Sequence, residues 1–192
     1  MKKTETVFQG KKFSVTVEEV ILPNGNRARM EVIQHPGSVA IIPWFGEERY
    51  LLIHQYRHCL GKTIWEFPAG TREEKESAEE CAYRELIEET GYRAGNLKKI
   101  LEFYATPGVT TEKMDLFLAS DLEKAPYRKL DEDEILEPKI FTLSEMEKMI
   151  EKKKIMDAKT ILGVWYLIKN KGSSGNRVGS HPPLLKGGEG GF

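Results

Sequence analysis

The chain has 192 residues, of which 40% are hydrophobic and 31% are charged, and its formal net charge is −1. This hydrophobic content supports one full domain with a core, and the near-neutral charge gives no basis for binding nucleic acid or a membrane surface. The two cysteines predict no disulfide framework, the N-terminus has no signal-peptide pattern, and no apolar stretch of about 18 residues predicts a membrane span, so we expect a cytoplasmic protein.

The first part of the chain predicts β-strands. Residues 13–22 and 28–34 are rich in β-branched side chains that partly alternate, and Asn24-Gly25 between them is typical of a hairpin turn. Because an isolated hairpin is only marginally stable in water, we expect it to pack against the main domain or a partner subunit. Further strands are predicted at residues 38–45, 49–55 and 64–67.

A helix with an acidic face follows these strands. Ser77 and Glu80 have the spacing of a capping box, which predicts a helix start near Ala78, and Gly91 is suited to end the helix. At 100° per residue, three glutamates share an arc of roughly 100° on this helix, namely Glu85, Glu88 and Glu89. Clustered carboxylates repel one another, a cation relieves that repulsion, and oxygen ligands suit Mg²⁺ or Mn²⁺. The alternative interpretation is a solvated acidic helix face.

The C-terminal part predicts further strands and two helices. Strands are expected at residues 98–105 and 114–119, joined by the loop 106–113, and an acidic loop at 130–134 precedes a strand at 139–142. Ser144 with Glu147 has capping-box spacing and predicts a helix at 145–153. Asp157 is the expected cap of a helix at 158–170, whose expected apolar face consists of Ile161, Leu162, Trp165 and Ile168.

This order of elements predicts the α/β class, as an α/β/α sandwich with a mixed β-sheet. We expect three units, which are an N-terminal β-hairpin subdomain at 1–36, a main domain at 37–170 and a tail at 171–192. The tail is rich in Gly, Ser and Pro and cannot bury a core, so we expect it to be disordered.

The stretch from Gly70 to Tyr92 resembles the Nudix box. That motif is Gly, five residues, Glu, seven residues, and then Arg-Glu-aliphatic-x-Glu-Glu-x-Gly-aliphatic. The matching residues are Gly70, Glu76, Arg84, Glu85, Leu86, Glu88, Glu89 and Gly91. The final aliphatic position departs from the motif because this chain has Tyr92 there. The resemblance implies the Nudix sandwich fold for residues 37–170, preceded by the hairpin.

The resemblance also implies a metal site. Glu85 and Glu89 would be the main metal ligands, with Glu88 and the backbone carbonyl of Ala69 assisting, and Mg²⁺ would be the cofactor with Mn²⁺ as a substitute. Glu88 is therefore also expected in the catalytic machinery.

The remaining box residues have implied supporting roles. Arg84, which we group with the catalytic residues, would pair with Glu76 and hold the acidic face in register. Gly70, Glu76 and Gly91 form the structural part of the box, and Gly70 is also expected to face the substrate.

A general base is expected outside the box, on the acidic loop. Glu132 is the first candidate for the base, and Glu134 is a candidate for a further metal ligand in the catalytic machinery. The alternative is that consecutive acidic residues simply form a solvated turn.

Features outside the box resemble the ADP-ribose pyrophosphatase branch. Pro107 lies 15 residues after Tyr92, as that branch requires, and the adjoining loop, including Glu112, resembles its substrate loop. Gln55-Tyr56-Arg57 resembles a segment whose arginine holds the diphosphate, which suits a planar guanidinium. The alternatives are a simple strand connector for the loop and an ordinary surface position for Arg57.

The hairpin resembles the element with which these enzymes form homodimers and complete the neighbouring site. By this analogy, Arg29 is a second phosphate contact and Phe8 an adenine-stacking residue, although most aromatic side chains simply belong to a core.

We therefore expect Mg²⁺-dependent hydrolysis of the diphosphate of ADP-ribose to AMP and ribose 5-phosphate, with a nucleoside diphosphate-linked small molecule and a second copy of the chain as partners. The alternatives are a Nudix hydrolase of another nucleotide sugar such as GDP-mannose, a nucleoside-triphosphate pyrophosphohydrolase, and a non-catalytic ADP-ribose-binding regulator.

Overall fold

The computed structural model describes residues 3–128, 130 and 135–171. The strands in chain order are β1 (Lys3–Gln9), β2 (Ser14–Ile21), β3 (Arg27–Gln34), β4 (Ser38–Pro43), β5 (Arg49–Arg57), β6 (Lys62–Glu66), β7 (Ala69–Thr71), β8 (Tyr92–Tyr104), β9 (Lys113–Lys124) and β10 (Leu136–Thr142). The helices are α1 (Ala78–Thr90), α2 (Leu143–Glu151) and α3 (Ala158–Lys171), with a short 3-10 turn at His58–Leu60.

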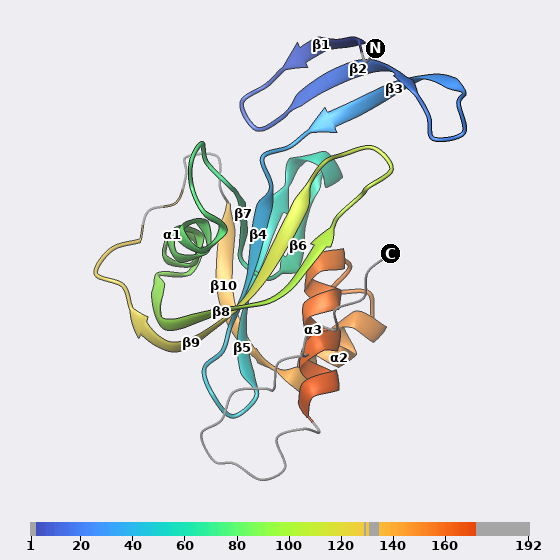
Figure 1. The fold of residues 1–192 in the computed structure, drawn as a ribbon. Coiled ribbons are helices and arrows are strands. Elements are labelled where there is room, and N and C mark those ends of the chain that lie inside the picture. Colours follow the sequence, from blue (N-terminus) through green and yellow to red (C-terminus); the bar gives the residue numbers. More distant parts are fainter. Residues whose placement is uncertain (1–2, 129, 131–134, 172–192) are drawn as a thin grey trace.

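The N-terminal residues form an antiparallel sheet of three strands, in the order β1-β2-β3. The predicted hairpin is its β2–β3 part, and Gly25 has the positive φ of 86° that its turn requires. The third strand, β1, was not predicted, because all of its residues are exposed and no buried face imposes an alternating pattern on them. The sheet lies at one end of the molecule, beyond the ends of β4 and β9 (Figure 1).

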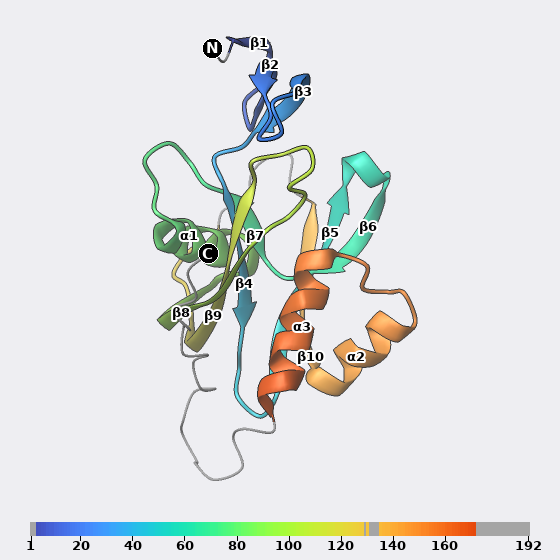
Figure 2. The same cartoon turned by 45° about the vertical axis from the view of Figure 1, so that its right-hand side comes forward.

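The main body contains a four-stranded sheet, β7-β4-β9-β8, and a three-stranded sheet, β10-β5-β6. Strands β4 and β9 are parallel, whereas the other pairs are antiparallel. Helix α1 lies on one side of the sheets, and α2 and α3 lie on the other, as the two views show (Figures 1 and 2). The predicted α/β/α sandwich with mixed strand directions is therefore confirmed.

Strand β4 separates the two parts of the core, since all six of its residues are buried. Val39 and Ile41 pack with Leu86 of α1, whereas Ala40 and Ile42 pack with the cluster that includes residues of α2 and α3. This strand has no polar face because helices cover both sides of the sheet.

Two predictions for the last helices were wrong. Helix α2 begins after Thr142, whose side chain forms the capping box with Glu145, rather than after Ser144. In α3, Ile161 and Ile168 pack on the core as predicted, but Leu162 is 36% exposed and Trp165 is 58% exposed, and the buried residues are Thr160, Gly163, Val164 and Leu167. Gly163 lies on the buried face of α3 and packs closely against Phe67. A Cβ at Gly163 would lie 2.8 Å from the Phe67 ring, so a larger residue would crowd it. None of the helices in the described ranges is long and apolar enough to cross a membrane.

The loop 106–113 attaches the N-terminal sheet to the main body. Ile33 at the end of β3 donates its N–H to the carbonyl of Val109 at 2.8 Å and accepts the N–H of Thr111 at 3.0 Å. The Thr111 hydroxyl accepts the N–H of His35 at 2.9 Å. These contacts hold the N-terminal sheet at one end of the main body (Figure 1).

Candidate active site

Helix α1 begins and ends where the sequence predicts. The Ser77 hydroxyl accepts the N–H of Glu80 at 3.2 Å, and the Glu80 carboxylate accepts the N–H of Ser77 at 2.8 Å. Gly91 has a φ of 73° and donates its N–H to the carbonyl of Ile87, the left-handed helix end that glycine favours. Tyr92, which replaces the aliphatic residue of the motif, packs edge-on against Phe45 with ring centroids 4.9 Å apart.

The predicted acidic face of α1 is turned inward. Glu89 is 0% exposed and Glu85 is 7% exposed, while Glu88 is half-buried. A carboxylate oxygen of Glu89 accepts the N–H of Ala69 at 2.9 Å. The alternative of a solvated acidic face is therefore wrong for Glu85 and Glu89, because solvated carboxylates would not be buried against β7.

Arg84 joins three carboxylates of the box. Its Nε and Nη2 donate to the two carboxylate oxygens of Glu76 at 2.8 and 2.9 Å, and its Nη1 lies 2.6 Å from Glu85 and 3.0 Å from Glu88. The hydrogen bond from Arg84 lowers the pKa of Glu76 to about 2, and the bond to Glu76 in turn raises the pKa of Arg84. The Arg84–Glu76 pair that the resemblance implies is thus present.

Gly70 allows β7 to lie directly over this carboxylate cluster. A Cβ at residue 70 would be 1.8 Å from Oε1 of Glu85, so no larger residue fits without moving that side chain. Strand β7 is itself held by antiparallel pairing of residues 69–71 with β4. The glycine of the motif therefore allows a close approach of backbone and carboxylate, because a Cβ there would displace the Glu85 side chain.

The carboxylate cluster has the donor chemistry of a site for a hard divalent cation, since it offers only oxygen atoms. Among the residues that the structure describes, no three acidic, histidine or cysteine side chains already converge in metal-ligand geometry, and the guanidinium of Arg84 lies among Glu76, Glu85 and Glu88. Cys81 is buried, and this burial raises the pKa of its thiol, so it offers no thiolate ligand.

Arg57 belongs to a second charged cluster. Its Nε and Nη2 donate to the two oxygens of Glu66 at 2.7 and 2.8 Å, and Glu66 is 0% exposed. Burial lowers the pKa of Arg57, but the hydrogen bond and charge of Glu66 outweigh this effect and raise it. Lys159 of α3 also contacts Glu66, at 2.5 Å.

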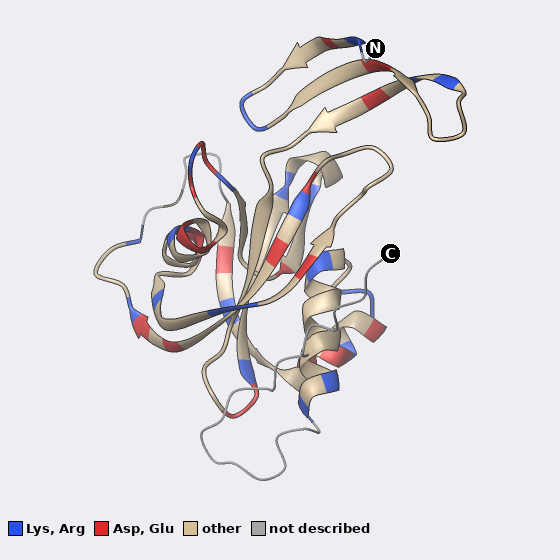
Figure 3. Ribbon diagram, in the orientation of Figure 1, with Lys and Arg blue, Asp and Glu red and all other residues tan. Residues whose placement is uncertain are grey.

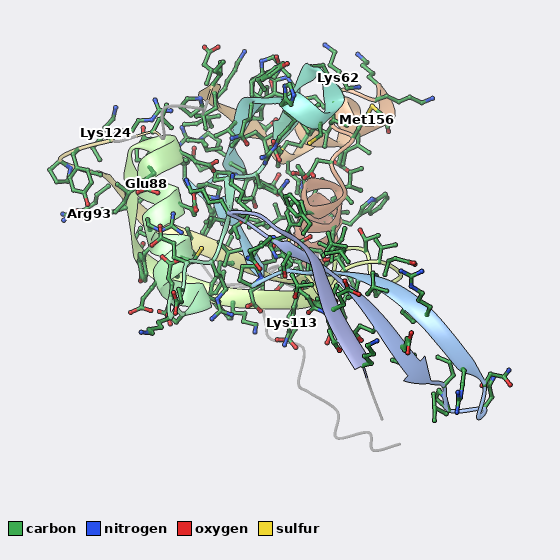
Figure 4. The ribbon with its side chains drawn as sticks, turned by 90° about the horizontal axis from the view of Figure 1, so that it is seen from above. Lys62, Glu88, Arg93, Lys113, Lys124 and Met156 are labelled. Carbon is green, nitrogen blue, oxygen red and sulfur yellow. The ribbon has the colours of Figure 1, made fainter. Side chains whose placement is uncertain are left out.

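One cavity of about 600 Å³ brings these parts together. It is lined by Arg57, by box residues on β7 and α1, by the segment that follows β7, and by the β1–β2 turn. The lining side chains include Gln9, Lys11, Lys12, Phe13, Gln34, Arg57, Arg72, Glu73, Arg84, Glu85 and Glu88. Seen from above, α1 with Glu88 and the β5–β6 hairpin with Lys62 lie on different sides of the N-terminal sheet (Figure 4).

Charges of both signs line this cavity. The acidic residues of α1 are visible as red segments beside the strands, and basic residues occupy the N-terminal turn above them (Figure 3). The structure therefore places carboxylates, guanidinium groups and one aromatic ring around a common space.

Four predicted substrate residues are not among those that line this cavity in the single chain. Phe8 packs against Phe13, with ring centroids 5.8 Å apart, and Arg29 lines a different hollow together with Glu19. Pro107 is exposed, and the carboxylate of Glu112 accepts a hydrogen bond from the Ser38 hydroxyl at 2.6 Å. Arg29 pairs with Glu19, away from the β1–β2 turn, whereas Phe8 lies beside that turn but is not among the residues that line the cavity.

Sequence reasoning missed the residues of the β1–β2 turn. Phe13 is 42% exposed and lines the cavity, as do Lys11 and Lys12. The sequence offered a local signal, since Gly10 and two lysines directly precede the predicted strand 13–22, whose first residue is Phe13. Without β1, that segment could not be recognised as a turn.

The expected general base Glu132 and the expected ligand Glu134 lie outside the described residues. The chain just before them contacts the end of α1, because Arg128 donates from Nη2 to the backbone carbonyl of Glu89 at 2.8 Å. Ala125 likewise donates its N–H to the carbonyl of Gly91 at 2.9 Å. Arg128 is thus a further residue near the box that the sequence did not reveal.

Comparison with known proteins finds relatives that match most of the chain. The chain is 42% identical over 164 residues to an ADP-ribose pyrophosphatase of Bacillus subtilis, covering 85% of this chain and 89% of that protein. It is 39% identical over 166 residues to a methanol dehydrogenase activator of Bacillus methanolicus, covering 86% and 90%. A GDP-mannose pyrophosphatase of Citrobacter koseri is 38% identical over 158 residues, covering 73% of this chain and 82% of that protein.

The fold and the family agree with these relatives. A crystal structure described as an ADP compounds hydrolase superposes with a TM-score of 0.77 at 25% identity, covering 90% of this chain and 94% of that one. Residues 34–161 match the NUDIX domain family. The box carboxylates gather beneath β7, and the family match covers two thirds of the chain. The chain therefore belongs to the Nudix family.

Proposed function

We propose that this protein is a divalent-metal-dependent pyrophosphatase that hydrolyses ADP-ribose to AMP and ribose 5-phosphate. The observation that supports the proposal is a cavity of about 600 Å³ that is lined by Glu85 and Glu88 of the box, by Arg57 and by Phe13. A nucleoside diphosphate sugar combines groups that match these side chains, because it has a charged diphosphate and an aromatic base. The similarity to the ADP-ribose pyrophosphatase of Bacillus subtilis supports the choice of ADP-ribose.

The carboxylate cluster is the proposed metal end of the site. Glu85 and Glu89 would hold Mg²⁺, or Mn²⁺ in its place, with Glu88 and the carbonyl of Ala69 assisting. The close packing of Gly70 on Glu85 fits this role, because it brings backbone and carboxylate oxygens to one place. When bound, a divalent cation supplies charge stabilisation to phosphate oxygens and acidifies a water molecule.

Arg84 has a supporting role in this proposal. Its bidentate pair with Glu76 fixes the guanidinium beside Glu85 and Glu88. It keeps the neighbouring carboxylates close together by partly cancelling their repulsion. Glu132 remains our proposed general base, and Glu134 the proposed additional ligand.

The opposite side of the cavity is the proposed end for the diphosphate and the base. Arg57 presents a permanently charged planar group that suits phosphate oxygens, and Arg72 and the lysines of the β1–β2 turn add positive charge nearby. Phe13, rather than Phe8, is the ring that we assign to base stacking within one chain. Phe8 supports it from behind, since the two rings are in contact.

A second copy of the chain is part of the proposal. The N-terminal sheet has an open edge at β1 with exposed Val7 and Phe8, and such an edge is suited to association. In a homodimer, Arg29 and the loop with Pro107 and Glu112 would contact substrate from positions that they do not reach in one chain.

The direct test is a substrate panel with Mg²⁺ that compares kcat/KM for ADP-ribose, GDP-mannose, ADP-glucose, diadenosine polyphosphates and nucleoside triphosphates. We expect at least about tenfold preference for ADP-ribose, equivalent to about 1.4 kcal/mol in transition-state binding, with AMP as a product. Assays without divalent cation are the control and should show no turnover. A preference for another compound would reject ADP-ribose as the substrate but retain the chemistry of the box.

GDP-mannose is the second candidate, because a relative of 38% identity is a GDP-mannose pyrophosphatase. Its guanine base and hexose differ from adenine and ribose at both ends of the diphosphate. Phe13 stacks equally well on either base, so the panel must decide between them. Binding of ADP-ribose without turnover of any compound would instead indicate a regulatory module.

A further inference from the structure

Glu66 is the centre of a buried ionic cluster that lies outside the Nudix box. Its carboxylate is 0% exposed and contacts Arg57 at 2.7 and 2.8 Å and Nζ of Lys159 at 2.5 Å. Nζ of Lys159 also lies 2.9 Å from Oδ1 of Asp157. Because a buried carboxylate is tolerated only when it is paired, the two cations account for the burial of Glu66.

The position of Lys159 is not explained by the stability of its own helix. It lies in the first turn of α3, where the helix dipole disfavours a positive charge. Its side chain is only 10% exposed, so it also loses the rotamer freedom that an exposed lysine would keep. Its contacts with Glu66 and Asp157 are what hold it there.

Helix α3 contacts the last residue of β6 and the first residue of the segment that connects β6 to β7. Lys159 contacts Glu66, and the next residue, Thr160, accepts the N–H of Phe67 at 2.9 Å. Arg57 lines the cavity of the candidate active site, whereas Lys159 and Glu66 are not among its lining residues. Within the described chain, Lys159 can therefore influence a ligand only through its neighbours.

We propose that Glu66 and Lys159 are positioning residues that aim Arg57 at the diphosphate and keep its charge available. Glu66 holds Nε and Nη2 of the guanidinium, which fixes the plane of the group. Lys159 shares Oε2 of Glu66 with Arg57 and offsets part of the negative charge that would otherwise neutralise it. This inference rests on the proposed function, in which Arg57 binds the diphosphate.

The proposal predicts a defect in substrate binding rather than in chemistry. Without Lys159, Arg57 alone would face the negative charges of Glu66 and Asp157, and less positive charge would be available to an anion in the cavity. A different route exists through the backbone, because the segment after Phe67 leads to Ala69, whose N–H contacts Glu89. A disturbance that followed this route would lower kcat, since it would reach a box carboxylate.

The test is a double-mutant cycle with Lys159→Met and Arg57→Met, assayed for KM and kcat with ADP-ribose and Mg²⁺. We expect Lys159→Met to raise KM about tenfold and to change kcat by less than about threefold. In the Arg57→Met background, the same substitution should change KM by less than about twofold, because the group through which it acts is gone. Lys159→Arg should restore KM, and Lys169→Met, at an exposed lysine of the same helix, is the matched control.

An equal increase in KM in both backgrounds, or a loss of kcat with unchanged KM, would overturn the proposal. If Lys159→Met does not fold, as judged by its melting curve, Lys159→Gln replaces it in the same cycle, because its amide removes the positive charge but can still donate a hydrogen bond to Glu66. A wild-type protein that prefers another nucleotide sugar would contradict the proposed substrate, and the cycle would be run with that sugar. If nothing is hydrolysed, the Kd for ADP-ribose replaces KM.

Discussion

The two arginine clusters beside the cavity differ in how far their charges balance. Around Arg84, one guanidinium contacts three carboxylates, those of Glu76, Glu85 and Glu88. The Glu66 carboxylate contacts Arg57 and Lys159, and Lys159 also contacts Asp157, so two cations face two carboxylates. The first cluster has more negative charge than its arginine can cancel, which favours a cation, whereas the second is balanced and has Arg57 as its proposed contact with an anion in the cavity. The number of carboxylates for each cation therefore distinguishes the two clusters.

One short segment connects the two clusters. Glu66 belongs to the Arg57 cluster, the N–H of Ala69 contacts Glu89, and Gly70 packs on Glu85. Because both clusters depend on the path of residues 66–70, the proposed metal and diphosphate ends are held at a fixed spacing. Substitutions in the carboxylate cluster around Arg84 should therefore change kcat, and substitutions in the cluster around Glu66 should change KM.

The largest effect is expected for Glu89→Gln in the carboxylate-rich cluster. It should lower kcat by about 10³-fold or more, because it removes a proposed metal ligand. Folding should persist, since the amide oxygen can still accept the N–H of Ala69. Glu79→Gln, at an exposed residue of the same helix, is the control. A kcat near that of the wild type, measured with saturating Mg²⁺, would contradict the assignment of Glu89 as a metal ligand.

The next effect is expected for Arg57→Met in the other cluster. It should raise KM by roughly 10- to 100-fold, because hydrogen bonds to charged groups contribute about 1.5–3 kcal/mol, and leave kcat within a few-fold. Arg49→Met, which removes an exposed arginine paired only loosely with Glu47 at 3.7 Å, is the control. An unchanged KM would show that Arg57 serves only to stabilise Glu66.

A smaller effect is expected for Gly70→Ala, which disturbs the segment shared by both clusters. The added Cβ would displace the Glu85 carboxylate, and overpacking of this kind costs about 1–3 kcal/mol of folding stability. Denaturant unfolding measures this loss, and kcat should fall with it. Gly108→Ala is the stability control, because no atom lies within 4 Å of a Cβ there. Equal stabilities for the two variants would contradict the close approach seen at Gly70.

The smallest effect concerns pH and the Arg84–Glu76 pair. Arg84 lowers the pKa of Glu76 from 4.5 to about 2 in the folded state, so the pair stabilises the protein above pH 4.5 and loses this contribution as the pH falls towards 2. The Tm difference between wild type and Glu76→Gln should therefore shrink over that range. A difference that stays constant would contradict the pairing, and Glu79→Gln provides the baseline.

Most secondary structure could be predicted, because local patterns determine it. The limits of α1 were correct to the residue, since a capping box and a terminal glycine specify them within the helix itself. The exposed strand β1 was not predicted, and the apolar face of α3 was predicted only in part, since Ile161 and Ile168 pack on the core but Leu162 and Trp165 are exposed. For α3, large apolar side chains suggested one face, but the close approach of Phe67 to Gly163 selected another.

The sequence by itself determined the box, the helix that carries it and the clustering of its glutamates, because these depend on contacts between residues a few positions apart. Only the tertiary structure decided that Phe13 rather than Phe8 lines the cavity and that Lys159 reaches Glu66, 93 residues away. Such contacts depend on how separate elements pack. A pattern that repeats along one helix or strand carries no information about which side chain of a distant element will meet it.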